Sequence, residues 1–213
     1  NKVRENIKIS KTIVATCDSE IESYINSIQG EVVMTSSSHD RASDRCSEAL
    51  SIIENKLETK FDIVLMIQGD EPLISSKMID DALEPLIENK SINVVNLKAR
   101  ILSKKEFDDP NCIKVVTDKN NNAIYFSRQS IPTMKDYNND AFKQVCVIPF
   151  RREFLISYNK MKPTKLEELE SIDMLRIIEN GFSVYMSETK EISFSVDTEE
   201  DLIKVNEYIS NNA

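Results

Sequence analysis

Short apolar runs alternate with longer amphipathic stretches along the first half of the chain. The apolar runs predict strands at residues 11–16, 31–35 and 62–67. The amphipathic stretches, each with Asp or Ser near its start as a cap, predict helices at residues 18–29, 43–60 and 75–90. The nearly unbroken apolar run at 62–67 is typical of a central parallel strand that is buried on both faces. This alternation predicts an α/β fold whose parallel strands are joined by right-handed crossovers.

The second half has shorter elements and more turn signals. Strands are predicted at residues 92–102, 112–117, 123–127, 144–150, 182–187 and 192–196. Helices are predicted at residues 153–159, 166–180 and from 197 or 198 to 209, and residues 1–10 resemble the end of a polar helix. The Asn-rich segment 119–122 predicts a turn, because Asn tolerates left-handed backbone, and Gly181 stands where a helix C-cap is expected.

The composition is that of a globular protein with one sizeable core. Of 213 residues, 40% are hydrophobic and 30% are charged, and we expect a single domain over residues 1–213. No apolar run approaches the roughly 20 residues that span a bilayer, so no membrane partner is expected. The net charge of −9 disfavours nucleic acid as a partner. The four cysteines form no C-x-x-C pair and are interpreted as free thiols of a cytoplasmic protein.

Two acidic segments follow predicted strands. Asp70 and Glu71 come directly after the buried strand at 62–67, in the segment Gln68-Gly69-Asp70-Glu71-Pro72. Ligands of open α/β sheets bind beyond the carboxyl ends of the strands, and adjacent carboxylates there suit Mg²⁺. Asp197 begins the acidic start of the last helix, which helix capping alone explains. From the residues alone, solvated turn acids and helix capping remain the alternatives.

An ordered set of short motifs resembles the CMP-Kdo synthetase family, the 3-deoxy-manno-octulosonate cytidylyltransferases. The matching segments are VATCD (14–18), MTS (34–36), HDRASDR (39–45), QGDEP (68–72), DPNCIKVV (109–116), YFSRQSIP (125–132), FR (150–151), LEELE (166–170), ENG (179–181) and VDTEEDL (196–202). The resemblance implies a Rossmann-like three-layer nucleotide-diphospho-sugar transferase fold with a mostly parallel sheet and an antiparallel dimerisation subregion. It also implies transfer of CMP from CTP to a sugar acid, with release of pyrophosphate, by a Mg²⁺-dependent homodimer.

The same resemblance implies roles for individual residues. Asp70 and Asp197 would be the catalytic metal ligands. The implied nucleotide-binding residues are Thr16, Ser36, Arg45 and Gln68. The implied acceptor-binding residues are Arg128, Gln144, Glu167 and Glu170; the last two lie three apart on one helix face, where both can reach one ligand. The sole histidine, His39, is interpreted as a surface or structural residue.

The sequence departs from the family in two places. The family opens with a strand and a basic pyrophosphate loop, which nothing here matches; only three glycines are present, and we expect a segment of about 30 residues to be absent from this sequence. In the acceptor region the family's histidine is replaced by Gln144, and its Leu-Glu-Gln by Ile172-Asp173-Met174. Loss of polar contacts changes substrate discrimination, so the acceptor could be Kdo, another ulosonic or nonulosonic acid, or a phosphonate.

Other functions on this scaffold stay open from the sequence. A nucleotidylyltransferase for another base would share the paired aspartates. A non-catalytic nucleotide-binding domain would explain the unmatched phosphate loop. A metal-dependent phosphatase is disfavoured because no strand end carries a D-x-D motif.

Overall fold

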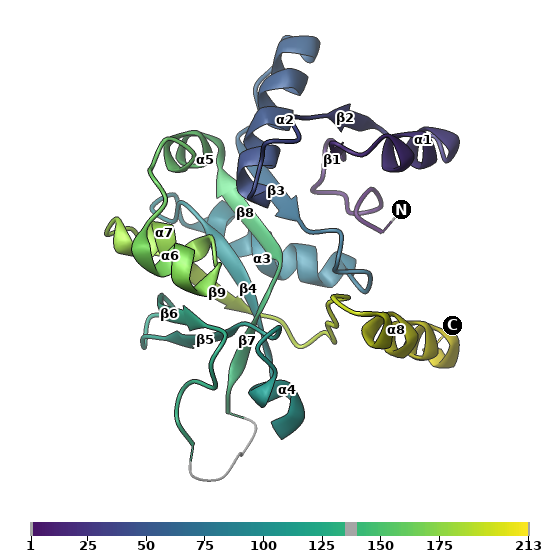
Figure 1. Cartoon of the computed structure of the whole chain (residues 1–213). Helices are drawn as coiled ribbons and strands as arrows, with labels where there is room; N and C mark the ends of the chain where they lie inside the picture. The colour runs from purple at the N-terminus through teal and green to yellow at the C-terminus, as the bar shows by residue number, and fades with distance from the viewer. Residues whose placement is uncertain (1, 135–139, 213) are drawn as a thin grey trace.

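The computed structural model of the chain describes residues 2–134 and 140–212 (Figure 1). The first half contains β1 (Val14–Thr16), α1 (Ser19–Ser27), β2 (Val32–Met34), α2 (Ala42–Leu57), β3 (Ile63–Ile67) and α3 (Ser76–Glu88). The middle contains β4 (Val95–Arg100), α4 (Lys104–Asp108), β5 (Lys114–Thr117), β6 (Ala123–Ser127), β7 (Phe142–Val145) and β8 (Val147–Arg151). The last part contains α5 (Arg152–Tyr158), α6 (Lys165–Glu170), α7 (Met174–Glu179), β9 (Tyr185–Glu188) and α8 (Glu199–Asn212).

The strands form three hydrogen-bonded groups. β1 pairs with β2 in parallel, β3 pairs with β8 in antiparallel orientation, and five strands follow the order β6-β5-β7-β4-β9. The α/β class is confirmed. The described strands nevertheless make only two parallel pairings, β1–β2 and β4–β9, against four antiparallel ones. The run at 62–67 was expected to be a central parallel strand, but β3 pairs with the antiparallel β8 along its whole length.

Helix starts follow the capping rules in most places. Asp18 accepts hydrogen bonds from the first turn of α1, and Ser75 caps α3 by accepting from the Met78 amide, as the sequence predicted. The predicted cap of α2, Ser43 or Asp44, was wrong by two to three residues. The cap position is Arg41, which makes no side-chain cap hydrogen bond, and Ser43 lies inside the helix, where its hydroxyl donates to the Asp173 carboxylate at 2.8 Å.

Two predicted elements are each split in two. The strand expected at 144–150 is divided at Cys146, where the chain leaves the five-stranded sheet as β7 and joins β3 as β8. The helix expected at 166–180 is divided into α6 and α7 by Ser171, whose φ of 55° is incompatible with a continuing right-handed helix. Gly181, with φ of 81°, ends α7 at the predicted position.

Two other predictions were wrong and one helix was missed. Residues 2–10 form turns rather than a helix, and residues 192–196 are extended but join no strand in the described part of the chain. The short helix α4, capped by Ser103, was not predicted, because five residues give no periodic signal. The Asn-rich turn is present, with Asn121 at φ of 62°.

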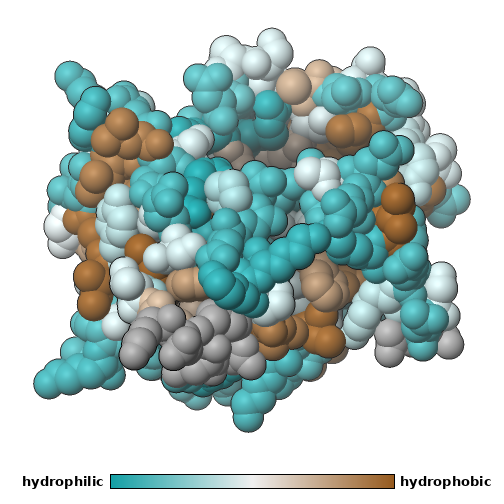
Figure 2. Space-filling model, turned by 60° about the horizontal axis from the view of Figure 1, so that its bottom comes forward, coloured by the Kyte–Doolittle hydropathy of each residue, from teal (hydrophilic) through white to brown (hydrophobic). Residues whose placement is uncertain are grey.

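Buried apolar side chains gather on two sides of the central strands. The larger cluster packs α5, α7, β6 and β8 together through residues that include Phe126, Phe150, Leu155, Tyr158 and Met174. The second packs α3 against β4, β7 and β8 through residues that include Ile79, Leu83, Leu97, Val145 and Val147. On the face in Figure 2, hydrophobic side chains lie in several small groups among hydrophilic ones. None of the helices formed by residues 2–134 and 140–212 is long and apolar enough to cross a membrane.

Candidate active site

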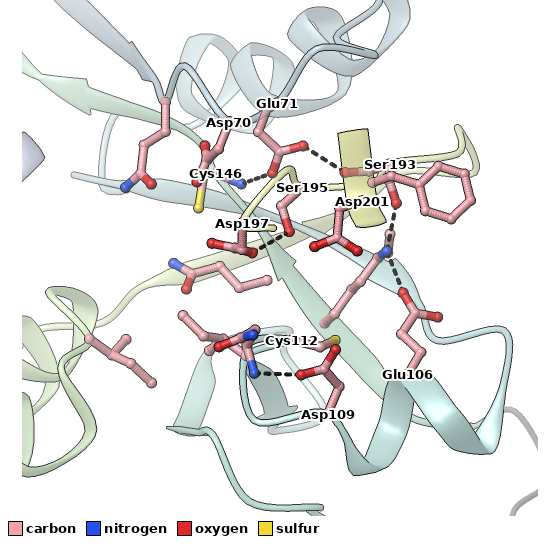
Figure 3. Close-up of a pocket in the computed structure, with 18 of the residues that line it drawn as sticks. Asp70, Glu71, Glu106, Asp109, Cys112, Cys146, Ser193, Ser195, Asp197 and Asp201 are labelled. Atoms are coloured by element: carbon pink, nitrogen blue, oxygen red, sulfur yellow. Dashed lines mark hydrogen bonds and ion pairs between the residues drawn. The ribbon is translucent and has the colours of Figure 1, made fainter. Parts of the chain in front are cut away.

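A cleft of about 950 Å³ lies where the turn after β3, the β7–β8 junction and the extended segment after β9 converge (Figure 3). Its wall includes five of the site residues predicted from the sequence: Gln68, Asp70, Arg128, Gln144 and Asp197. The turn supplies the first two, and the segment between β9 and α8 supplies the last. The structure therefore brings both candidate metal ligands, Asp70 and Asp197, to one cleft.

A backbone hydrogen bond joins the two segments that carry the aspartates. The Val196 amide donates to the Asp70 carbonyl at 2.9 Å, which places Asp197 beside the turn (Figure 3). The Asp197 carboxylate accepts from the Ser195 hydroxyl at 3.2 Å. Thr198, and not Asp197, then caps α8, since its hydroxyl exchanges hydrogen bonds with Asp201. Helix capping therefore leaves Asp197 available for the cleft.

Asp70 lies in a setting that suits a cation. Its Oδ1 is buried and has no hydrogen-bond partner among the described residues. Burial raises the pKa of the Asp70 carboxyl, and the negative charges of Glu71 and Asp197 raise it further. An unpartnered buried carboxylate oxygen facing a second carboxylate is stabilised by a hard cation such as Mg²⁺.

The donor set is small. Within residues 2–134 and 140–212, no group of three or more His, Cys, Asp or Glu side chains is placed to hold a metal. Asp70 and Asp197 would therefore be the protein's whole contribution, which fits Mg²⁺ because this ion is usually held by one or two carboxylates with substrate phosphates and water. The adjacent acid is not a third ligand. Both Glu71 carboxylate oxygens already accept hydrogen bonds, from the Cys146 amide and the Ser193 hydroxyl.

Three of the four residues predicted to bind the nucleotide, Thr16, Ser36 and Arg45, lie together near the ends of β1 and β2, whereas the fourth, Gln68, lies in the cleft wall. Arg45 Nη1 donates to the Thr35 hydroxyl at 2.6 Å and to the Ser36 carbonyl at 3.3 Å. The Thr16 carbonyl in turn accepts from the Thr35 amide at 2.9 Å. Thr16, Ser36 and Arg45 thus form one hydrogen-bonded group, outside the wall of the cleft described above.

His39 belongs to the loop beside this group. Its Nε2 contacts the Glu48 carboxylate, which also accepts from the Ser36 amide at 2.9 Å. These hydrogen bonds and the His39 charge lower the pKa of Glu48. The arrangement agrees with a structural role for His39, because its ring contacts the carboxylate that holds the Ser36 amide.

Backbone carbonyls hold the Arg128 side chain in the cleft wall. Its Nε donates to the Glu170 carbonyl at 2.8 Å and its Nη1 to the Pro110 carbonyl at 3.1 Å. The buried Lys114 ammonium supports the same region by donating to three carbonyls, those of Asp109, Cys112 and Arg128. Burial lowers the pKa of Lys114. A guanidinium fixed in this way is prepared to bind a planar anion such as a carboxylate.

Hydrogen bonds also determine which way the Gln144 amide points. Asn96 donates both amide hydrogens to backbone carbonyls, those of Leu97 and Val145, so its Oδ1 must accept. Gln144 Nε2 donates to this oxygen at 2.6 Å. The Gln144 carbonyl oxygen and the second amide hydrogen are therefore left to meet a ligand, the first as an acceptor and the second as a donor.

Glu167 and Glu170 do not lie in the cleft wall. Glu167 is fully buried and forms a bidentate ion pair with Arg176, with Nε–Oε2 and Nη2–Oε1 distances of 2.7 and 2.5 Å. The Glu170 carboxylate accepts from the Ser127 hydroxyl and the Arg128 amide. We expected both carboxylates to reach one ligand, but in the structure they bind different protein groups outside the cleft wall. Glu170 contributes to the cleft indirectly: its carboxylate accepts from the Arg128 amide and its carbonyl accepts from Arg128 Nε, which fixes the arginine in the wall.

Sequence reasoning missed a charged group on the opposite wall, formed by Arg41 and Asp173. Arg41 Nε lies 3.6 Å from Asp173 Oδ1, and its Nη1 donates to the Ser171 hydroxyl at 2.9 Å. Burial raises the pKa of Asp173, although the Ser43 hydrogen bond and the Arg41 charge oppose this. The sequence did hold one signal of this group: Asp173 is a charged residue between two apolar ones, Ile172 and Met174.

Comparisons with known proteins agree with this geometry. A family profile described as "Cytidylyltransferase" matches residues 1–192. The 3-deoxy-manno-octulosonate cytidylyltransferase of Fusobacterium nucleatum is 40% identical over 96% of this chain and 82% of its own length. The enzyme of the same name from Geobacter metallireducens is 40% identical over 95% of this chain and 82% of its own length.

Solved structures give the same result for the fold. A CMP:2-keto-3-deoxy-manno-octonic acid synthetase complexed with CTP superposes with a TM-score of 0.86 at 27% identity, over 100% of this chain and 86% of the other. A putative glucose-1-phosphate thymidylyltransferase from Bacillus anthracis shares only the fold, with a TM-score of 0.62 at 14% identity over 97% and 78% of the two chains. The fold and family expected from the motifs are confirmed: this chain belongs to the cytidylyltransferase family.

Proposed function

We propose that this chain transfers CMP from CTP to 3-deoxy-manno-octulosonate (Kdo) and releases pyrophosphate. Two relatives at 40% identity carry the name of this activity, and the similar solved structure is a complex with CTP. The observation that carries the proposal is that Asp70 and Asp197 line one cleft, where the backbone hydrogen bond from Val196 to Asp70 holds their two segments together.

In this proposal Asp70 and Asp197 hold Mg²⁺. The ion would supply positive charge to the phosphates and to the attacking acceptor oxygen. The chain's own residues position the partners for in-line attack on the α-phosphate. The group of Thr16, Ser36 and Arg45, with Gln68, serves the nucleotide, and Arg128 binds the acceptor carboxylate.

The nucleotide and the acceptor can be tested in one assay. The protein is incubated with Mg²⁺, Kdo and each of CTP, UTP and dTTP, and pyrophosphate release is measured. CTP is expected to be the preferred nucleotide, and omission of Kdo should remove the signal. Release with UTP or dTTP but not with CTP would overturn the proposal. Replacing Kdo with a nonulosonic acid or a phosphonate in the same assay identifies the acceptor class.

Gln144→His is expected to raise kcat/KM for Kdo by about two- to tenfold. An imidazole can donate one N–H to Asn96 Oδ1 and offer its second nitrogen to the acceptor, and one net hydrogen bond contributes about 0.5–1.5 kcal/mol. Kdo saturation curves measure the change. Gln144→Leu is the matched control and should lower the same ratio. An unchanged ratio in both variants would show that position 144 does not set acceptor specificity.

The proposal also includes a homodimer and a cytoplasmic location. In the described part of the chain, β6 is an edge strand of the five-stranded sheet, and its Ile124 is 57% exposed. An open edge with an apolar residue suits pairing with a second copy. All four cysteines are free, as expected in a reducing compartment. Light scattering on the purified protein tests the dimer.

A further inference from the structure

We propose that Glu71 is a positioning residue: it holds the segment that carries Asp197 against the turn that carries Asp70, and so sets the affinity of the site for a divalent cation. The inference rests on the proposed metal pair. It assigns a role to the neighbouring acid, whose two carboxylate oxygens both accept hydrogen bonds from the protein itself.

Glu71 connects three segments that are far apart in the sequence. Its side chain belongs to the turn after β3 and is only 5% exposed. One carboxylate oxygen accepts from the Cys146 amide at 2.9 Å, at the junction of β7 and β8. The other accepts from the Ser193 hydroxyl at 2.7 Å, in the segment before α8 (Figure 3). Hydrogen bonds to a buried carboxylate are among the stronger ones in proteins.

The segment that carries Asp197 depends on such bonds for its position. Between Thr189 and Thr198 it joins no strand in the described part of the chain. Ser193 is held twice, by Glu71 through its hydroxyl and by the Lys143 ammonium through its carbonyl at 2.6 Å. Val196 is held by the Asp70 carbonyl. Asp197 is the next residue, so a shift at Ser193 would move its carboxylate relative to Asp70.

The chemistry explains why a carboxylate is required. Two donors, an amide and a hydroxyl, approach the two separate oxygens of Glu71. Glutamine has the same shape, but one of the two oxygens is replaced by an NH₂ group. This group cannot accept a hydrogen bond, so either the Cys146 amide or the Ser193 hydroxyl would lose its acceptor. Aspartate keeps both acceptors but is one methylene shorter, and it should restore part of the effect.

The test measures cation binding and backbone position without relying on turnover. Mn²⁺ binding in the presence of CTP, without acceptor, is followed by electron paramagnetic resonance. Glu71→Gln is expected to weaken Mn²⁺ binding roughly tenfold, a common effect of removing an outer-shell hydrogen bond. Ser193→Ala should weaken it less, and Glu71→Asp should lie between wild type and Glu71→Gln. Hydrogen–deuterium exchange at the Val196 amide is expected to accelerate in the same order.

Glu54→Gln is the matched control. Glu54 is also a buried carboxylate that accepts from a backbone amide, that of Phe61, and from a second side chain, Arg152, but it lies away from the cleft. Glu54→Gln should lower the unfolding temperature without changing Mn²⁺ affinity or exchange at Val196.

The inference is overturned if Glu71→Gln and Ser193→Ala behave like Glu54→Gln. If Glu71→Gln does not fold, Ser193→Ala alone decides between the two results. Loss of Mn²⁺ binding in Asp70→Ala but not in the Glu71 or Ser193 variants would reject the positioning role and keep the metal pair; normal binding in Asp70→Ala would instead reject the metal pair itself.

Discussion

Asp70→Ala and Asp197→Ala are each expected to lower kcat by about three orders of magnitude while the protein stays folded. Each substitution removes one of the two carboxylates that would hold Mg²⁺ in the cleft. Metal ions stabilise transition-state charge by several kcal/mol, and about 4 kcal/mol corresponds to a thousandfold change in rate. In the proposed site these are the two protein ligands, so loss of either would leave too few to fix the ion.

The folded state should tolerate the change at Asp70, because its carboxylate has an unpartnered buried oxygen. Burial raises the pKa of this acid in the folded state. An acid whose pKa is raised by folding opposes folding once the pH exceeds its unfolded value of about 3.9. Wild type should therefore lose stability relative to Asp70→Asn as the pH rises from about 4 through the raised pKa, and the difference should persist at pH 7.

Two measurements check this prediction. Pyrophosphate release gives kcat at saturating CTP, Kdo and Mg²⁺, and thermal unfolding at pH 4 and pH 7 gives the stability difference. Asp118→Asn, in the remote turn between β5 and β6, is the control: hydrogen bonds from Asn122 and Asn120 lower the pKa of this half-buried acid, so its loss should not stabilise the protein at pH 7 and should leave kcat unchanged. Near-normal kcat in either alanine variant would refute the two-aspartate assignment. An Asp70→Asn protein less stable than wild type at pH 7 would mean that the carboxylate has a partner.

Local signals in the sequence predicted much of this fold. Asp18 and Ser75 begin helices because their side chains accept from free amides of the first turn, and this chemistry needs no information from distant residues. Asn121 and Gly181 mark chain reversals for an equally local reason, their tolerance of positive φ. The position of Asp70 after β3 followed from the apolar run that precedes it.

Contacts between distant segments could not be predicted in the same way. The strand expected at 144–150 breaks at Cys146 because its first part pairs with β4 and its second part with β3. At the break, the Cys146 amide donates to Glu71, which lies 75 residues earlier in the chain. The extended segment at 192–196 has the pattern of a strand, but its anchors are single bonds to Asp70, Glu71 and Lys143. The family motifs supplied Asp197 as a candidate, and only the structure supplied the hydrogen bond that places it beside Asp70.

Glu167 illustrates the opposite error. Its helical spacing from Glu170 suggested that the two acids share a ligand, because residues three apart lie on one face of a helix. In the structure, however, helix α6 ends at Glu170, and Arg176 from the next helix fills the space beside Glu167. Arg176 is therefore the partner of Glu167, and the spacing of residues along the sequence could not identify it.

Arg176→Met is expected to destabilise the protein by about 3–5 kcal/mol, the largest stability effect we predict. Arg176 and Glu167 are 3% and 0% exposed, and removal of Arg176 leaves the buried Glu167 carboxylate with the more distant guanidinium of Arg41, at 3.7 Å, as its counter-charge. The guanidinium also lies 4.9 Å from the centre of the Tyr158 ring, so packing is lost as well. For a protein of this size the unfolding temperature should fall by about 6–20 °C.

A second substitution separates the buried charge from the lost packing. In Glu167→Leu with Arg176→Met, neither charge remains, and most of the stability should return because apolar replacements of buried ion pairs are often neutral or stabilising. Lys77→Met, which breaks the exposed Lys77–Asp81 pair on α3, is the surface control and should change stability by less than about 1 kcal/mol. If Arg176→Met were as stable as wild type, the Arg41 guanidinium, 3.7 Å from Glu167, would be sufficient to compensate the buried carboxylate, and the prediction would be wrong.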